Sequence, residues 1–258
     1  MSTFKIATWN VNSLRVRLPH VQEWLNTAKP DVLALQETKL PDADFPFDAI
    51  HEAGYNAVAS GQRTYNGVAI LSREKASDII TDIPELDDPQ RRVLFATIGD
   101  IGVLNIYVPN GESVGSEKYQ YKLNWLHKLD LFLKHQLKKH SKIIVLGDFN
   151  IAPDEIDVHD PKLWDGQVLF SQPERKAFKD MLAVGFQDCF RMLQPAEKSY
   201  SWWDYRMNAF RRNMGLRIDH ILASETLAAY CTRCYIDKTP RSLERPSDHA
   251  PVVAEFKL

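Results

Sequence analysis

The segment Ile143-Ile144-Val145-Leu146-Gly147-Asp148-Phe149-Asn150 is the stretch of this sequence that says most about its fold. Four consecutive aliphatic residues before a glycine are typical of a strand that is covered on both faces. Directly after the glycine, Asp148 and Asn150 place a carboxylate and an amide two residues apart, where the strand is expected to end. This segment therefore predicts a buried strand whose end carries polar functional groups.

The same pattern of short apolar runs recurs along the chain. Predicted strands cover residues 5–9, 32–36, 67–71, 93–98, 102–108, 143–147, 218–223 and 251–256. Apolar residues at three- and four-residue spacing predict helices over residues 17–28, 117–140 and 173–184. Strands that are interleaved with helices, but also adjacent to one another, predict an α/β (α+β) protein with two packed mixed sheets and helices outside.

The bulk composition is that of an ordinary globular protein. Of the 258 residues, 44% are hydrophobic and 26% are charged, and no tract has low complexity. Large α/β enzymes reach this length as one unit, so we expect a single domain over residues 1–258. The net charge of −2 means that affinity for a polyanion has to come from local basic clusters.

Cysteine usage and hydropathy bear on the cellular compartment. The three cysteines, Cys189, Cys231 and Cys234, are an odd number in a long chain, which argues against a disulfide framework. The first residues lack an apolar signal segment, and no apolar run approaches the roughly 18 residues that span a bilayer. We therefore expect a cytoplasmic protein that does not contact a membrane. A monomer is expected as well, but the sequence leaves the oligomeric state open.

Hard oxygen ligands follow two of the other predicted strands. Asn10 comes after the run 6–9, and Glu37 comes after the run 32–36. Magnesium prefers oxygen ligands and is commonly held by one or two carboxylates together with a substrate phosphate. We predict that Glu37 binds such a cation with the amide oxygen of Asn10. The alternative for each residue alone is an exposed strand end or a turn.

The pair Asp148 and Asn150 is predicted to act on the nucleophile of a phosphate ester hydrolysis. In that role Asp148 accepts a proton from the attacking water or orients it, and Asn150 holds the water or the phosphate in line. A Gly-Asp-X-Asn sequence also fits a simple Asx turn, which is the structural alternative.

His249 is the predicted partner of a phosphate that gains negative charge in the transition state. A carboxylate on one ring nitrogen makes an imidazole a better cation and fixes its tautomer. Asp219 is the best candidate for that carboxylate, and Asp248 is a candidate ligand of a second metal or a candidate support for the ligating residues. His220 remains a competing imidazole, and a lone histidine near the C-terminus is more often structural.

A basic and aromatic segment predicts contact with nucleic acid. Residues 206–217 contain four arginines and no acid, which gives a local charge of +4. Arginine binds phosphate in a bidentate fashion, and aromatic rings stack on sugars or unpaired bases. The alternative is that Trp202 and Trp203 belong to the core and that the arginines keep a loop soluble. The predicted DNA contacts in this segment are Trp202, Arg206, Arg211, Arg212 and Arg217.

Three further residues are candidates for contact with the substrate. The hydroxyl of Tyr107 is predicted to donate to a phosphate oxygen, and Asn110 follows it in the next turn. Lys118 lies near the start of a predicted helix, and most lysines of this helix lie outside its apolar face. For Lys118 the alternative to contact with the DNA backbone is a position on a solvent-exposed helix face.

Six motifs occur in order across nearly the whole chain, and together they resemble the exonuclease III and apurinic/apyrimidinic endonuclease family. They are Thr8-Trp9-Asn10-Val11-Asn12, Leu35-Gln36-Glu37-Thr38-Lys39, Tyr107-Val108-Pro109-Asn110-Gly111, Gly147-Asp148-Phe149-Asn150, Gly215-Leu216-Arg217-Ile218-Asp219 and Ser247-Asp248-His249-Ala250-Pro251. The resemblance implies a four-layer sandwich similar to that of deoxyribonuclease I, with the site at one edge between the sheets. It also implies that Mg²⁺, for which Mn²⁺ can substitute, supports hydrolysis of double-stranded DNA beside abasic sites or from 3′ ends.

The resemblance implies the same roles that the chemistry of these residues favours. The metal ligands are Glu37 and Asn10, with Asp248 as the remaining acid of the site. The catalytic groups are Asp148, Asn150, Tyr107 and the pair His249 with Asp219. Trp202 and Leu216 occupy the positions of an apolar pocket in the DNA-binding surface.

Residues 163–168 depart from the pattern of family members that are strong in abasic-site cleavage. Those members carry small or amide residues beside the flipped sugar, whereas this chain carries Leu-Trp-Asp-Gly-Gln-Val. Larger or charged groups, Asp165 and Gln167 among them, would narrow that pocket. The sequence therefore leaves open the balance between abasic endonuclease and 3′ exonuclease activity.

Two alternatives belong to other functional classes. The same superfold also serves phosphatases that act on inositol phosphates or lipid head groups. The basic and aromatic segment and the lack of a membrane anchor count against that function. A DNA-binding protein without catalysis is the other alternative, and the presence of all the candidate catalytic residues counts against it.

Overall fold

Strand β8 (Ile143–Asp148) lies inside a six-stranded sheet, and all six of its residues are buried, as the sequence predicts. The computed structural model describes residues 2–258 of the chain. On one side β8 pairs in parallel with β7 (Ile101–Tyr107), and on the other it pairs antiparallel with β10 (Asp219–Ser224). The strand order of this sheet is β5-β6-β7-β8-β10-β9.

The second six-stranded sheet is built around the N-terminal strand. Strand β1 (Thr3–Asn10) pairs in parallel with β2 (Val32–Gln36) and antiparallel with β12 (Val252–Lys257). Its strand order is β11-β12-β1-β2-β4-β3. The remaining strands of the two sheets are β3 (Asn56–Ser60), β4 (Val68–Ser72), β5 (Ser77–Ile80), β6 (Val93–Ile98), β9 (Phe186–Asp188) and β11 (Cys231–Ile236).

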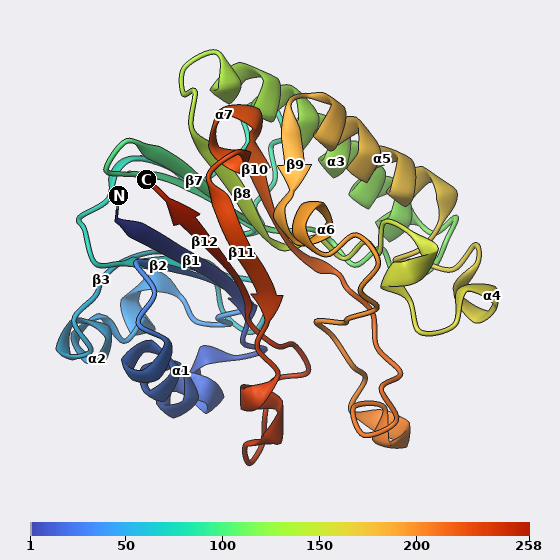
Figure 1. The fold of residues 1–258 in the computed structure, drawn as a ribbon, viewed down its shortest axis with the longest axis horizontal. Coiled ribbons are helices and arrows are strands. Elements are labelled where there is room, and N and C mark those ends of the chain that lie inside the picture. Colours follow the sequence, from blue (N-terminus) through green and yellow to red (C-terminus); the bar gives the residue numbers. More distant parts are fainter. Residues whose placement is uncertain (1) are drawn as a thin grey trace.

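The helices form the outer two of four layers (Figure 1). Helices α1 (Leu14–Ala28) and α2 (Phe47–Glu52) share a hydrophobic cluster with the sheet that contains β1. Helices α3 (Glu117–Leu137) and α5 (Gln172–Ala183) pack on the sheet that contains β8. A third cluster fills the space between the sheets. Three short helices lie in connections: α4 (Pro161–Trp164), α6 (Cys189–Leu193) and α7 (Glu225–Ala228).

The predicted architecture of two packed mixed sheets flanked by helices is confirmed. The eight predicted strands and three predicted helices are all present, with ends within three residues of those expected. Four strands, β3, β5, β9 and β11, were missed. All four lie at the edges of their sheets, and their partly exposed or polar residues lack a continuous apolar run.

The topology brings several strand ends to one end of the sandwich. In one sheet Asn10 is the register partner of Gln36, so Glu37 follows beside it. In the other sheet Asp148 is paired with Tyr107 on one side and with Asp219 on the other. The segments near residues 206 and 240 extend from this same end (Figure 1).

Within residues 2–258, no helix has both the length and the apolar character needed to cross a bilayer.

Candidate active site

A buried imidazole stands between two buried carboxylates at this end of the sandwich. The Nδ1 atom of His249 lies 2.9 and 3.1 Å from the two carboxylate oxygens of Asp219. Its Nε2 atom lies 3.8 Å from Asp148 Oδ2, which is too far for a hydrogen bond. The predicted pairing of Asp219 with His249 is confirmed. Because Nε2 has no closer hydrogen-bonding partner within residues 2–258, its N–H can donate to an oxygen of a bound phosphate ester.

Local backbone geometry explains how β8 delivers Asp148. Gly147 has a φ of +148°, and a Cβ added there would lie 1.9 Å from the carbonyl oxygen of Ile106. Only glycine therefore allows the close approach of β7 and β8 just before the Asp148 carboxylate. Asn150 has a φ of +50°, and its backbone N–H donates to Asp148 Oδ1 at 2.9 Å. The Asx turn that was the structural alternative is present, and it orients the Asp148 carboxylate.

Asn10 links Glu37, the predicted metal ligand, to Asp148, the predicted base. Its Nδ2 donates to Glu37 Oε1 at 3.0 Å and to Asp148 Oδ2 at 2.9 Å. Glu37 Oε1 also accepts the hydroxyl of Tyr107 at 2.9 Å, and Glu37 Oε2 lies 2.9 Å from the ammonium of Lys39. The residues predicted from distant parts of the sequence therefore converge on one site.

The pKa values of the two carboxylates move in opposite directions. Burial alone would raise the pKa of Glu37, but Lys39 and the hydrogen bond from Asn10 hold it below its usual value. Burial raises the pKa of Asp148 to about 7, against the opposing charge of His249. Glu37 is therefore an anion across the neutral range, whereas Asp148 exchanges a proton near neutral pH.

The carboxylates around His249 also set its charge. Burial alone would lower its pKa, but Asp219, and after it Asp148, raise the pKa of His249 to about 10. The ring is therefore an imidazolium at neutral pH, with Asp219 fixing the orientation of its Nδ1–H.

The donor set of the site fits a hard divalent cation. The carboxylates Glu37, Asp148 and Asp219 gather near two cationic side chains, Lys39 and His249. Asp148, Asp219 and His249 also offer ligand atoms that all lie within 4.8 Å of one another. Since Nδ1 of a protonated His249 is already bound to Asp219, the oxygen atoms of Glu37 and Asp148 suit such a cation better than the imidazole does.

The structure places Asp248 on the rim of the site. Its Oδ1 accepts from Asn12 Nδ2 at 3.0 Å, and its Oδ2 accepts from Trp202 Nε1 at 3.0 Å. Neither oxygen contacts Glu37 or Asn10 among the hydrogen bonds of residues 2–258. Asp248 therefore holds Trp202 in place, and its metal-binding role stays a prediction.

Sequence reasoning missed three residues that support the site. Lys39 bridges Glu37 and Asn12, with its ammonium 2.6 Å from Asn12 Oδ1. Ser201 donates to Asp219 Oδ2 at 2.6 Å. Asn12 and Lys39 lie inside motifs that were recognised, so position within the motif was the available signal. Nothing in the sequence around Ser201 marked it.

Asn110 and Asn150 lie side by side beyond the ends of β7 and β8. Asn110 is exposed, and its Nδ2 donates to Asn150 Oδ1 at 3.4 Å. Asn150 Nδ2 donates to the Val108 carbonyl at 2.9 Å. This arrangement leaves the Asn110 side chain at the surface, where a substrate can reach it.

The basic segment divides into exposed and buried arginines. Arg211 and Arg212 are exposed, and so is Arg206, which pairs with Asp204 at 2.7 Å. Arg217, in contrast, is 1% exposed. It lies 2.6 Å from Asp157 and 2.8 Å from Asp188. The prediction that Arg217 contacts DNA is therefore wrong, because its donors are used inside the protein.

The apolar part of the predicted DNA surface is also mostly buried. Leu216 has no exposed surface and packs under the partly buried Trp202. Leu216 therefore supports Trp202, and the prediction that it contacts DNA itself is corrected. Trp202 keeps an accessible face. Lys118 is exposed and pairs with Glu112 at 3.1 Å, and its contact with DNA stays a prediction.

His220, the competing imidazole, belongs to the core. It is 1% exposed, its Nε2 lies 2.8 Å from the Ile151 carbonyl, and it packs edge-on against Phe149. Burial, with the charge of Arg217, lowers the pKa of His220 to about 4. It is therefore neutral at physiological pH, and its buried position fits a structural role.

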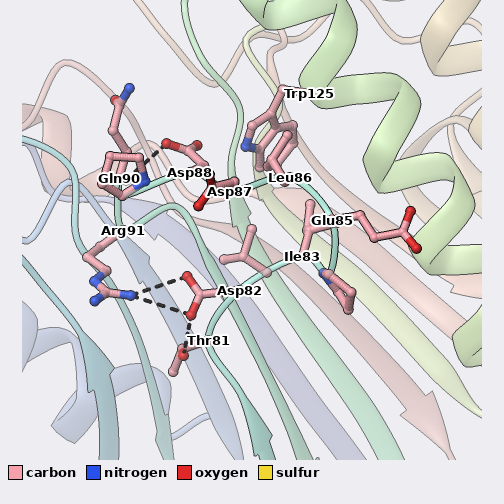
Figure 2. Close-up of a pocket in the computed structure, with 13 residues that line it drawn as sticks. Thr81, Asp82, Ile83, Glu85, Leu86, Asp87, Asp88, Gln90, Arg91 and Trp125 are labelled. Atoms are coloured by element: carbon pink, nitrogen blue, oxygen red, sulfur yellow. Dashed lines mark hydrogen bonds and ion pairs between the residues drawn. The ribbon is translucent and has the colours of Figure 1, made fainter.

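A cavity of about 670 Å³ lies away from these residues, between the loop 81–91 and Trp125 (Figure 2). Its wall includes the carboxylates of Asp82, Glu85, Asp87 and Asp88. This concentration of negative charge would repel a nucleic acid backbone. The cavity therefore does not compete with the strand-end site as the place where a phosphate ester binds.

Comparisons with known proteins agree with the geometry of the site. Residues 7–249 match the sequence profile of the endonuclease/exonuclease/phosphatase family. The chain is similar to exodeoxyribonuclease III of Haemophilus influenzae, with 36% identity covering 98% of this chain and 100% of that protein.

Two solved structures are similar over almost the whole chain. One is the 3′ phosphatase NExo from Neisseria bound to a product DNA hairpin, with a TM-score of 0.98 and 47% identity over 99% of this chain and 100% of that chain. The other is an AP endonuclease from Archaeoglobus fulgidus, with a TM-score of 0.96 and 43% identity over the same shares of the two chains.

Proposed function

Because the chain belongs to the endonuclease/exonuclease/phosphatase family, we propose that it is a metal-dependent DNA repair nuclease that hydrolyses phosphodiester bonds of duplex DNA. The observation that carries the proposal is the buried group of Asp148, His249 and Asp219, joined through Asn10 to Glu37. This group brings together a proposed base (Asp148), a cation (His249) and a proposed metal ligand (Glu37). The relatives named exodeoxyribonuclease III and AP endonuclease support DNA as the substrate.

The attacking water is proposed to bind between Asp148 and Asn150. The raised pKa of Asp148, about 7, makes its carboxylate an effective proton acceptor near neutral pH. The hydrogen bond from Asn10 fixes one carboxylate oxygen, and the N–H of Asn150 fixes the other. Asp148 is thus held in one orientation while the water oxygen bonds to phosphorus and the ester P–O bond breaks.

Charge that develops on the phosphate is proposed to be met by His249 and Tyr107. The free Nε2–H of the His249 imidazolium donates to a non-bridging oxygen, and Asp219 keeps the ring aligned. Burial, and then Glu37, raise the pKa of Tyr107 well above its usual value, so its hydroxyl remains a donor. Mg²⁺, with Mn²⁺ as a substitute, would supply electrophilic stabilisation of the phosphate when held by Glu37. The oxygen of Asn10, the other predicted ligand, accepts from the Asn12 N–H at 2.9 Å, and its Nδ2 is the atom directed at Glu37 and Asp148.

We further propose that hydrolysis at 3′ ends predominates over abasic-site cleavage. The similar structure named as a 3′ phosphatase was solved with a DNA hairpin, which supports 3′ termini as the substrate. Trp164 and Val168 pack against the apolar cluster that contains Leu216 and Trp202. They belong to the segment 163–168, which the resemblance to abasic endonucleases associates with the flipped abasic sugar. The cytoplasmic location, the monomeric state and the single domain stay predictions from the sequence.

A gel assay tests the proposal with two duplexes in Mg²⁺, one carrying a single abasic analogue and the other a recessed 3′ end. We expect shortening from the 3′ end to be faster than incision at the analogue. His249→Asn should lower kcat by about 100-fold or more with little change in DNA affinity, because it removes a transition-state donor. His127→Asn, an exposed histidine on α3, is the matched control.

Other outcomes of this assay would favour the alternatives. Release of inorganic phosphate from inositol phosphates without DNA cleavage would favour the phosphatase. DNA binding without metal-dependent cleavage would favour a non-catalytic protein. Wild-type turnover in His249→Asn would show that the imidazole has another role.

A further inference from the structure

A buried ion pair lies directly behind the site. Lys122 of α3 and Glu174 of α5 are both 0% exposed, and their Nζ and Oε1 atoms are 2.5 Å apart. We propose that Lys122 is a positioning residue that fixes the two loops carrying Asn110 and Asn150 in the orientation needed for hydrolysis. This inference rests on the proposed nuclease function.

All three donors of the Lys122 ammonium are used, and two of them reach the catalytic loops. Nζ donates to the Asn150 carbonyl at 2.7 Å and to the Asn110 carbonyl at 3.1 Å. The third bond goes to Glu174. One atom therefore ties together the chain segments that leave the parallel strands β7 and β8.

A shift of the Asn150 backbone would directly displace groups that take part in the proposed reaction. Asn150 is in the left-handed region, with a φ of +50°, which costs energy for a residue with a Cβ. Its N–H orients Asp148, and its Oδ1 accepts from Asn110. The bond from Lys122 to its carbonyl holds this residue from the opposite side.

Glu174 is itself fixed independently of Lys122. Its Oε2 accepts from both the N–H and the hydroxyl of Ser171 in the capping box of α5, at 3.0 and 2.5 Å. Its Oε1 also accepts from the Leu169 N–H at 3.1 Å. The carboxylate is thus a rigid anchor at the start of a helix, and the ammonium that it binds has little freedom.

The energetics of buried ion pairs suggest a variant that tests the positioning role of Lys122 separately from its contribution to folding stability. Removing one partner leaves an uncompensated buried charge, whereas replacing both partners with neutral groups of similar size is often close to neutral for stability. Glutamine at position 174 can still accept from Ser171, because glutamine also serves in capping boxes. The double variant Lys122→Met with Glu174→Gln is therefore expected to fold without the bonds to the two loops.

We expect this double variant to keep a melting temperature near that of the wild type but to lose at least tenfold in kcat on a 3′-recessed duplex. Its KM should change less than twofold, because Lys122 does not touch DNA. Hydrogen exchange measured by mass spectrometry should be faster in residues 149–152 and 109–111. Lys134→Met, on the exposed face of the same helix, is the matched control and should change none of these quantities.

A second variant keeps the test decisive if the double variant does not fold. Lys122→Arg retains the charge beside Glu174, but a planar guanidinium cannot direct donors at both carbonyls in the same way. We expect about threefold or greater loss in kcat at nearly unchanged stability.

A folded variant with wild-type kcat and wild-type exchange in residues 149–152 would overturn the positioning role. If the wild type does not cleave DNA, the proposed function fails, and the exchange experiment alone decides whether Lys122 fixes these loops.

Discussion

At the residue scale, the amide of Asn10 contacts two carboxylates, Glu37 and Asp148, that have different proposed roles. Asn10 donates to both Glu37 and Asp148, yet their pKa values move apart. Lys39 is close to Glu37 and keeps it ionised, whereas Asp148 is buried and shares its surroundings with Asp219. Groups whose environments separate their pKa values in this way suit different tasks, here metal binding and proton transfer.

Glu37→Gln tests the metal-binding role. Glutamine keeps the size of the side chain but removes the anionic ligand, so metal affinity should fall by about 10-fold or more. The Mg²⁺ concentration that gives half-maximal cleavage should rise accordingly, and excess Mg²⁺ should restore part of the rate. Titration of activity with Mg²⁺ measures this shift. An unchanged metal requirement would remove Glu37 from the set of ligands.

The buried Asp157 offers a test of stability against pH. Burial alone would raise its pKa, but Arg217, and after it Arg191, hold it below its usual value of 3.8. A depressed folded-state pKa contributes stability that is present above the unfolded-state pKa and is lost as the pH falls through the folded-state pKa. Asp157→Asn should therefore cost about 3 kcal/mol at pH 7, and this cost should shrink as the pH falls below about 4.

Urea unfolding at pH 7 and pH 3 measures the difference between the two proteins. Asp180→Asn, which removes an exposed carboxylate paired with Lys176, is the control and should change stability by less than about 0.5 kcal/mol. A gap between wild type and Asp157→Asn that is the same at both pH values would contradict the depressed pKa.

The sequence located residues whose place follows from the end of an apolar strand, but not those whose burial depends on remote charged partners. Glu37, Asp148 and His249 stand at strand ends, and strand ends could be located from apolar runs. Arg217 has the same local sequence signals as Arg211, but its partners Asp157 and Asp188 are remote in the chain. A buried ion pair of this kind gives no signal in the local charge pattern.

At the scale of elements, the site exists because two parallel strands approach each other very closely at Gly147. Gly147→Ala combines a backbone of positive φ with a Cβ only 1.9 Å from the Ile106 carbonyl. We expect a loss of at least about 2 kcal/mol in unfolding free energy, together with loss of activity as Asp148 is displaced. Denaturant unfolding and the cleavage assay measure the two effects.

Gly54→Ala separates the two causes of that loss. Gly54 also has a positive φ, of +86°, but a Cβ there would meet no atom within 4 Å. It should therefore show only the conformational cost, about 1 kcal/mol. Equal losses in the two variants would mean that the contact between β7 and β8 relaxes without penalty.

The elements that sequence reasoning missed share a physical cause. A strand buried on both faces, such as β2 or β4, begins with four consecutive apolar residues and was predicted. Edge strand β5 reads Ser-Asp-Ile-Ile and is largely exposed, so burial imposes no pattern on it. The fold could be predicted because the inner strands determine it, whereas the edges had to be observed.

At the scale of the whole molecule, a protein of net charge −2 has to attract DNA through the part of its surface beside the site. The segment that contains Arg206, Arg211 and Arg212 extends from the end of the sandwich where the catalytic residues lie (Figure 1). The acidic cavity wall of residues 82–88 lies elsewhere. This uneven distribution of charge would orient the duplex toward the strand ends.

The double variant Arg211→Gln with Arg212→Gln tests this orientation. Each phosphate contact that is lost should lower the slope of log Kd against log salt concentration by about 0.9, so the pair should lower it by about 1 to 2. Affinity should fall equally for abasic and recessed duplexes, because phosphate contacts carry no information about the lesion. Lys138→Gln with Lys139→Gln, exposed just beyond the end of α3, removes the same charge and should leave the slope unchanged. Equal slopes for the two double variants would mean that net charge, and not this segment, governs binding.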